Sequence, residues 1–216
     1  MTKKVIMFDF DGTIADTLDA IVSITNRLAV EFGYKQTTQE ELAQIQNLNS
    51  KEIIKQSGIS IFKLPFLLRK VKAELNKEIQ RVRPISGIKE ALIELKNQGN
   101  RLGILTSNSS ANVVAFLETN GLEDLFDFIY SGKTLFGKSK VMNNLLKQEN
   151  IDPKTAIYVG DETRDIEAAR KSHIKAIAVS WGFNSAEVLA KQNPDFLIHQ
   201  PNQLIEVIGS LQTLRD

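Results

Sequence analysis

The feature that most constrains this chain is a short apolar run, residues 5–8, which ends directly at the two carboxylates of Asp9 and Asp11. The run is rich in strand formers and predicts a buried β-strand. Gly12 then lets the backbone turn sharply, and Thr13 adds a hydroxyl beside the acids. Two carboxylates at the end of a buried strand repel each other unless a positive charge lies between them. A hard divalent cation such as Mg²⁺ would meet this need, whereas the simpler alternative is a polar turn that only ends the strand.

The length and composition of the chain exclude several classes of protein. A chain of 216 residues with 42% hydrophobic residues can bury the core of one large domain, or of a domain with a sizeable insertion. The net charge of +1 creates no strong field for nucleic acid or a membrane surface, and no apolar run is long enough to span a bilayer. The absence of cysteine excludes disulfides, thiolate metal sites and a cysteine nucleophile. The first strand begins too early for a signal peptide, so we expect a soluble cytoplasmic protein without nucleic-acid or membrane partners.

Residues 18–83 contain helical patterns and no convincing strand. Apolar residues recur at helical spacing, and glycines such as Gly33 separate the periodic segments. We therefore predict a cap domain of about four helices over residues 17–83. It would be inserted into a catalytic core formed by residues 1–16 and 84–216.

Basic residues crowd the last part of this helical segment. One interpretation is a cap that steers a phosphate anion. The simpler alternative is a solvated helix face, because lysine and arginine are common at protein surfaces. The residues are Lys63, Arg69, Lys70, Lys72, Lys77, Arg81 and Arg83.

From Pro84 onward, predicted strands and helices alternate. This pattern favours an α/β fold with a Rossmann-like parallel sheet core covered by helices on both faces, to which the all-helical cap is added. In such sheets, ligands bind at the carboxyl ends of the strands, and the polar clusters of this chain follow those ends. The expected strands are 101–105, 126–130, 156–159 and 176–179, and the expected helices are 88–97, 111–120, 138–148 and 166–172.

Two of these clusters suit an anion. Thr106, Ser107 and Asn108 follow a strand and precede a helix, where a hydroxyl and backbone amides can bind a phosphate, or simply cap the helix. Lys138 begins a helix, where its charge opposes the helix dipole. A lysine there can neutralise a phosphate and a neighbouring carboxylate. The alternatives are a solvent-facing Lys138, or Lys140 in the same role.

A third cluster, GDETRD, follows the strand predicted at 156–159. One carboxylate of Asp161 and Asp165 could complete a Mg²⁺ site with Asp9, and the other could orient it. The alternative is an ion pair of Asp165 with Arg164 or with Arg170.

Taken together, the strings DFDGTIADT, LTS, GK and GDETRD resemble the four signatures of the haloacid dehalogenase-like hydrolases. The similarity spans residues 5–182, including the position of the helical cap, and it is greatest with the phosphoglycolate phosphatase-like group. Residues 185–216 carry no motif of this kind.

The resemblance implies roles for the four aspartates. Asp9 would be the nucleophile and a Mg²⁺ ligand. Asp11 would be the general acid and base, with its backbone carbonyl on the metal. Asp161 would be a direct metal ligand, and Asp165 would support it.

The resemblance also implies a phosphate site. Thr106 would bind the transferring phosphoryl group, with Ser107 and Asn108 beside it, and Lys138 would steady the nucleophile and the phosphate. One departure affects the lysine: Ser139 follows Lys138, where many members of the superfamily carry proline.

We therefore expect a Mg²⁺-dependent phosphatase that hydrolyses a small phosphorylated metabolite similar to phosphoglycolate through an aspartyl-phosphate, acting as a monomer or homodimer. Alternatives on the same core are a phosphosugar mutase and a pyrophosphatase. A metal-independent dehalogenase would need neither Asp11 nor Asp161. A phospho-receiver signalling module would not need a helical insertion, and its acceptor Asp would end a later strand than its metal-binding acids.

Overall fold

The computed structural model describes residues 3–132 and 137–213, so the two ends of the predicted core, 1–2 and 214–216, lie outside the described residues. Six described strands form one sheet in the order β3-β2-β1-β4-β5-β6. Every neighbouring pair is parallel. The strands are β1 (Val5–Phe8), β2 (Arg101–Thr106), β3 (Phe128–Ser131), β4 (Ala156–Gly160), β5 (Lys175–Val179) and β6 (Phe196–Ile198). The predicted α/β class is confirmed.

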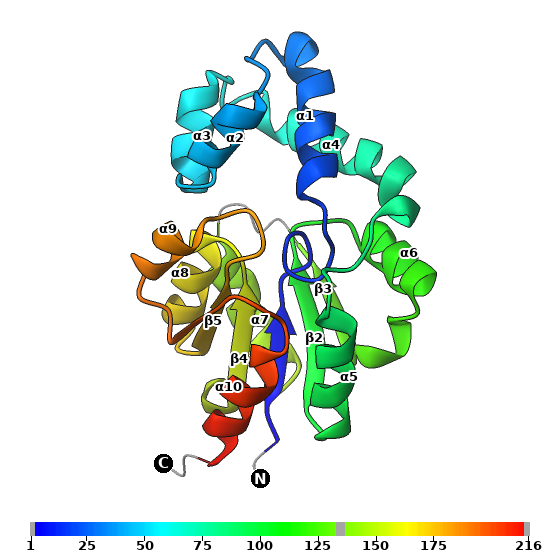
Figure 1. Ribbon diagram of the computed structural model, residues 1–216, viewed down its shortest axis with the longest axis vertical. Coiled ribbons are helices and arrows are strands. Elements are labelled where there is room, and N and C mark those ends of the chain that lie inside the picture. Colours follow the sequence, from blue (N-terminus) through cyan, green and yellow to red (C-terminus); the bar gives the residue numbers. More distant parts are fainter. Residues whose placement is uncertain (1–2, 133–136, 214–216) are drawn as a thin grey trace.

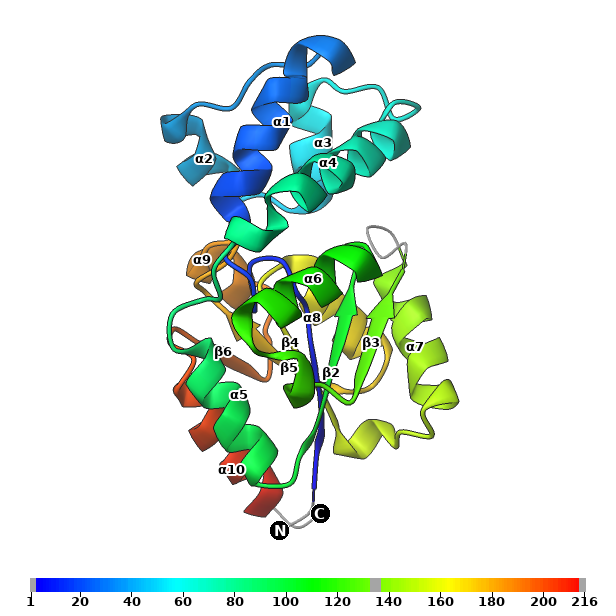
Figure 2. The same cartoon turned by 90° about the vertical axis from the view of Figure 1, so that its right-hand side faces the viewer.

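Helices cover both faces of this sheet and also form a separate group above it (Figures 1 and 2). The helices around the sheet are α5 (Ile88–Asn97), α6 (Ser110–Asn120), α7 (Lys138–Gln148), α8 (Thr163–Lys171), α9 (Ala186–Ala190) and α10 (Gln203–Thr213). The group above it contains α1 (Leu18–Phe32), α2 (Gln39–Ile45), α3 (Ser50–Ser57) and α4 (Leu64–Glu78). Short 3-10 turns occur at Ile79–Arg81, Glu123–Leu125 and Pro153–Thr155.

Helix α8 begins three residues earlier than its apolar pattern predicts. The reason is a capping box, in which the Asp165 carboxylate accepts a hydrogen bond from the backbone N–H of Glu162 at 3.0 Å. A reciprocal cap of this kind satisfies backbone donors that the helix itself leaves unpaired. The cap therefore places Asp165 in the first turn of the helix, close to the end of β4.

Strand β1 lies at the centre of the sheet, between β2 and β4. Its side chains alternate between two cores: Ile6 and Phe8 belong to one, and Met7 belongs to the other. Phe8 is in register with Ile104 on β2 and with Val159 on β4. Because the three strands are parallel and in register, the residues that follow them meet at one edge of the sheet.

Helices α1–α4 form the all-helical cap, which lies over this carboxyl edge (Figure 2). The chain enters and leaves the cap through two segments that lie side by side: Ala15 bridges to Pro84, and the Asp16 N–H donates to the Arg83 carbonyl at 2.9 Å. We propose that the cap domain spans residues 17–83, because this pairing closes the core on either side of that range. None of the described helices combines the length and the apolar character needed to span a membrane.

Phe116→Ala should destabilise the protein by about 3–5 kcal/mol, because it leaves a cavity in the core. Phe116 is fully buried on α6 and packs edge-to-face on Phe10, with ring centroids 5.1 Å apart. The control is Val114→Ala on the same helix, where the side chain is 41% exposed and the expected cost is about 0.5 kcal/mol. Urea unfolding measures both, and equal losses would contradict this packing.

Candidate functional site

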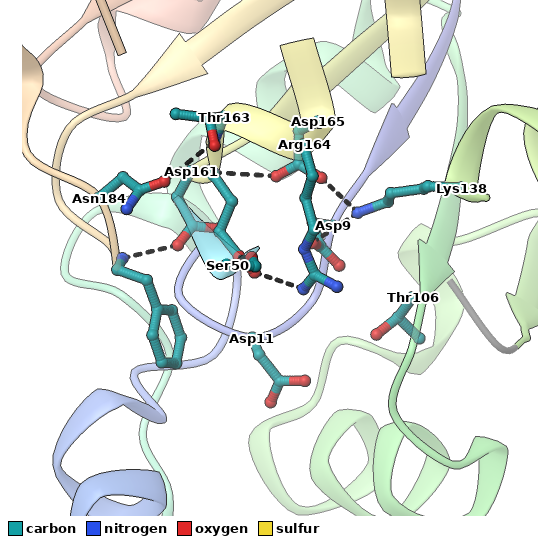
Figure 3. Close-up of polar contacts among 12 residues, drawn as sticks. Asp9, Asp11, Ser50, Thr106, Lys138, Asp161, Thr163, Arg164, Asp165 and Asn184 are labelled. Atoms are coloured by element: carbon teal, nitrogen blue, oxygen red, sulfur yellow. Dashed lines mark hydrogen bonds and ion pairs between the residues drawn. The ribbon is translucent and has the colours of Figure 1, made fainter. Parts of the chain in front are cut away.

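Three buried carboxylates converge where the central strands end (Figure 3). Asp9 follows β1, Asp161 follows β4, and Asp165 comes from the first turn of α8. One oxygen from each lies within 4.8 Å of the others. The structure thus brings together the three side chains that the sequence analysis predicted around a metal ion.

The surroundings of these three carboxylates disfavour their charged forms. Burial, followed by repulsion from neighbouring acids, raises the pKa of Asp161 well above its ordinary value. Burial also raises the pKa of Asp165 to about 6, although Lys138 opposes that shift. Carboxylates held this close are stabilised in their charged form by a cation between them. Hard oxygen ligands suit Mg²⁺ or a similar ion, so the residues present fit a divalent metal.

Lys138 supplies the positive charge in direct contact with the cluster. Its Nζ donates to Asp9 Oδ2 at 2.7 Å and also to Asp165. Burial would lower the pKa of Lys138, but Asp165 and Asp9 raise it above its ordinary value. Lys140, the alternative considered from the sequence, is exposed. Asp165 therefore pairs with Lys138, whereas the sequence alternatives for it were Arg164 and Arg170.

Asp11 lies outside the cluster of three carboxylates and contacts Asn108. Asn108 Nδ2 donates to both oxygens of Asp11 at 3.0 Å. Burial, together with the charge of Asp9, raises the pKa of Asp11 to about 7, against the effect of this hydrogen bond. The side chain of Asn108, which we predicted to bind substrate, thus contacts Asp11 directly.

A chain of amides links Asp11 to the cap. Asn108 Oδ1 accepts from Asn112 Nδ2 at 2.9 Å, and Asn112 Oδ1 accepts from Asn76 Nδ2 at 2.6 Å. Asn76 lies on α4 of the cap, whereas Asn112 lies on α6 of the core. The sequence analysis missed both residues, because neither belongs to a motif and they come together only when the cap packs on the core.

Thr106 is buried at the end of β2, below Lys138 in the view of Figure 3. Its Oγ1 accepts a hydrogen bond from the Asn108 N–H at 2.9 Å. Because the oxygen acts as the acceptor, the hydroxyl hydrogen can point toward a phosphoryl oxygen. Ser107 is partly buried beside it, and Ser109 caps α6.

Asp161 is held by groups that the sequence analysis did not assign to it. Thr13 Oγ1 donates to Asp161 Oδ1, and the Phe183 N–H donates to Oδ2, both at 2.7 Å. An added Cβ at Gly12 or Gly182 would lie 2.4 or 2.2 Å from Asp161 Oδ2. These glycines are required because the backbone approaches the carboxylate closely.

The cap contacts the core beside this cluster. Ser50 Oγ on α3 donates to Glu162 Oε2 at 3.1 Å. Asn184 Nδ2 donates to the carbonyls of Gln46 and Leu48, at 3.2 and 3.0 Å, and its Oδ1 accepts from the Thr163 N–H. These contacts join α2 and α3 to the loops after β4 and β5.

The sequence of this chain is similar to those of known proteins. The sequence profile of a family described as haloacid dehalogenase-like hydrolase matches residues 6–179. A phosphoglycolate phosphatase from Synechococcus elongatus is 36% identical over 208 residues, which cover 96% of this chain and 98% of that protein. A phosphoglycolate phosphatase from Aquifex aeolicus is 24% identical, covering 96% and 97% of the two chains.

Solved structures share the fold. A predicted phosphatase from Clostridium acetobutylicum has a TM-score of 0.83 and 21% identity, covering 97% of this chain and all of that one (100%). A protein from Rhodobacter sphaeroides, CbbY in complex with phosphate, has a TM-score of 0.73 and 20% identity, covering 94% and 96% of the two chains.

Gly182→Ala should weaken binding of a divalent cation by about 10- to 100-fold, the range seen when the groups that orient a ligand are disturbed. The added Cβ would overlap Asp161, so the carboxylate must move. Gly209→Ala on α10 is the control, because a Cβ there meets nothing within 4 Å. Calorimetric titration with Mg²⁺ measures both variants. If Gly182→Ala binds Mg²⁺ as wild type does, Asp161 is not a ligand.

Proposed function

Because the chain belongs to the haloacid dehalogenase-like hydrolase family, we propose that it is a Mg²⁺-dependent phosphatase that hydrolyses a small phosphomonoester similar to phosphoglycolate. The observation that carries the proposal is the buried contact of Lys138 with Asp9, with the carboxylates of Asp161 and Asp165 beside it. The identity to a phosphoglycolate phosphatase over nearly the full length supports the substrate class.

Asp9, Asp161 and Asp165 would hold the ion, with Asp11 contributing its backbone carbonyl as the family resemblance implies. When bound, Mg²⁺ would supply positive charge for the phosphoryl oxygens. Lys138 would add a second positive charge beside Asp9, and Thr106 would donate a hydrogen bond to a phosphoryl oxygen. The short contact of Lys138 with Asp9 and the burial of Thr106 support these roles.

Asp9 would be the nucleophile. Its carboxylate would form a bond to phosphorus while the bond from phosphorus to the leaving oxygen breaks, which yields an aspartyl-phosphate and splits one difficult step into two. Asp9 Oδ1 accepts a hydrogen bond from the Phe10 N–H at 2.8 Å, and Oδ2 accepts from Lys138 at 2.7 Å. Both contacts hold the carboxylate in one orientation.

Asp11 would transfer the protons. It would give a proton to the leaving oxygen in the first step. In the second step it would take a proton from the water that attacks phosphorus, which releases inorganic phosphate and restores Asp9. The hydrogen bonds from Asn108 to both Asp11 oxygens support this role, because they fix the position of the carboxyl group.

The wild-type protein should release phosphate from phosphoglycolate in the presence of Mg²⁺ and lose this activity in EDTA. Asp161→Asn should reduce turnover sharply, because it removes one charge from the proposed metal site. A phosphate-release assay on a panel of phosphorylated metabolites measures this. A folded protein that releases no phosphate from any of them would exclude the phosphatase proposal, and full turnover without metal would exclude the site.

Asp9→Asn and Asp11→Asn should fail in different ways. Asp9→Asn removes the nucleophile, so no phosphoenzyme should form. Asp11→Asn removes proton transfer, which contributes on the order of 10²–10⁴-fold in rate. With p-nitrophenyl phosphate the leaving group needs little protonation. Asp11→Asn should therefore accumulate phosphoenzyme and show a burst of nitrophenol before slow turnover.

Rapid quenching of both variants decides between these roles. Phosphorylation of the Asp9→Asn protein would show that another residue is the nucleophile. Absence of a burst with Asp11→Asn, in a protein that folds as wild type does, would show that Asp11 is not needed to activate water.

A further inference from the structure

Arg164 lies deep in the site but is only partly paired. Its guanidinium points from the start of α8 toward the space between Asp9 and Asp11 in Figure 3. Nη2 donates to Glu162 Oε1, whereas Nε and Nη1 are buried and have no hydrogen-bond partner among the described residues. The side chain is 18% exposed. Buried N–H donors without an acceptor cost free energy, so these atoms need a partner that the described residues do not supply.

A second cation approaches the same space from the cap. Lys72 lies on α4, and its backbone carbonyl accepts a hydrogen bond from Asn112 Nδ2 at 3.1 Å, which holds this turn of the cap against α6. Lys72 is close enough for the charges of Asp11 and Arg164 to act on the pKa of its ammonium group. Arg164 and Lys72 therefore place positive charge beside Asp11, on the side that faces the cap.

The position of these cations relative to Asp11 indicates which part of a substrate they would meet. A general acid must lie within hydrogen-bond reach of the leaving oxygen. In the view of Figure 3, Lys138, which donates to Asp9, and Thr106 lie to the right of Asp9, whereas Asp11 lies below it. The groups around Asp11 would therefore contact the leaving group of the ester.

We propose that Arg164, assisted by Lys72, binds a second anionic group on the leaving portion of the substrate, such as the carboxylate of a phosphorylated hydroxy acid. This inference rests on the proposed phosphatase function. It goes beyond it by assigning specificity to an arginine that lies between the metal-site aspartates in sequence. Hydrogen bonds between charged partners are short and strong, and Nε and Nη1 of Arg164 are free to donate to such a partner.

A cavity lies on one side of Arg164, between the cap helix α3, the start of α7, and α8. Its volume is about 320 Å³, and its lining includes Arg164, Lys138, Lys51, Lys171 and the acidic Glu167, but neither Asp11 nor Lys72. Lys51 and Lys171 are exposed at its border, where they would attract an anionic substrate before it reaches the buried charges.

The alternative is that Arg164 only balances the charge of the acidic cluster. Glu162, Asp9 and Asp165 do raise its pKa against the effect of burial. A charge-balancing arginine would affect every phosphomonoester equally, because all of them share the phosphoryl group and the metal. A residue that binds the leaving group would affect only substrates with the second anion.

Two substrates of nearly equal shape separate these alternatives: 2-phosphoglycolate, and 2-hydroxyethyl phosphate, which has a neutral hydroxymethyl group in place of the carboxylate. For Arg164→Met, kcat/KM for 2-phosphoglycolate should fall about 10- to 100-fold more than kcat/KM for 2-hydroxyethyl phosphate, the range for a lost hydrogen bond to a charged group. Most of the difference should be in KM. Arg164→Lys should restore part of the preference, because it keeps the charge but not the planar donors.

Arg69→Met is the matched control, because Arg69 is an exposed arginine on α4, the helix that carries Lys72. It should leave the ratio of the two kcat/KM values within about twofold of wild type, as expected for an exposed charge. Equal losses on both substrates for Arg164→Met, or no loss on either, would overturn the anion-site proposal without contradicting the phosphatase function.

A binding measurement separates the proposal of an anion site at Arg164 from the proposal of a phosphatase function. In an Asp9→Asn background, calorimetry with Mg²⁺ present should show 2-phosphoglycolate binding more tightly than 2-hydroxyethyl phosphate, and adding Arg164→Met should remove this difference. If the wild-type protein hydrolyses no phosphomonoester but this preference is present, the anion site stands and the phosphatase function fails. If the preference is absent, the anion site fails.

Discussion

The buried contacts of Lys138 with Asp9 and Asp165 are the interactions on which the rest of the site depends. Removing a lysine and two carboxylates from water costs several kcal/mol per ion, and their attraction repays this only with close geometry. Here the lysine contacts both acids, yet no cation among the described residues contacts Asp161, which lies against the same cluster. Burial, together with the excess of negative charge, raises the pKa values of Asp161 and Asp165, and the same excess explains why a divalent ion suits this position.

The sheet topology explains why these groups meet. Strands β2 and β3 lie on one side of β1, and β4, β5 and β6 lie on the other. The order of the strands therefore reverses next to β1, where a crevice forms in parallel sheets. Asp9 and Asp161 directly follow β1 and β4, and Thr106 is the last residue of β2. A strand register shifted by one residue would turn their side chains to the other face.

The cap covers the site, which would otherwise be an open edge of the sheet. Several of its contacts with the core are polar: Ser50 binds Glu162, Asn76 binds Asn112, and Asn184 binds two carbonyls at the end of α2. None of these residues could be selected from the sequence, because each pair joins segments that are far apart in the chain and have no shared pattern. Arg164 was considered only as a partner of Asp165, and its pairing with Glu162 follows from the way α8 is capped.

The sequence by itself determined the strand formed by residues 5–8, the alternation of strands and helices after Pro84, and the motif acids, since local propensity and apolar periodicity are properties of neighbouring residues. Only the tertiary structure decided that Lys138 rather than Lys140 reaches Asp9, that Asn108 holds Asp11, and that glycines from separate loops make room for Asp161. Those outcomes depend on distances between segments brought together by burial of two hydrophobic cores. Burial is non-directional, so side-chain partners are selected by the geometry of the packed elements, which no local pattern encodes.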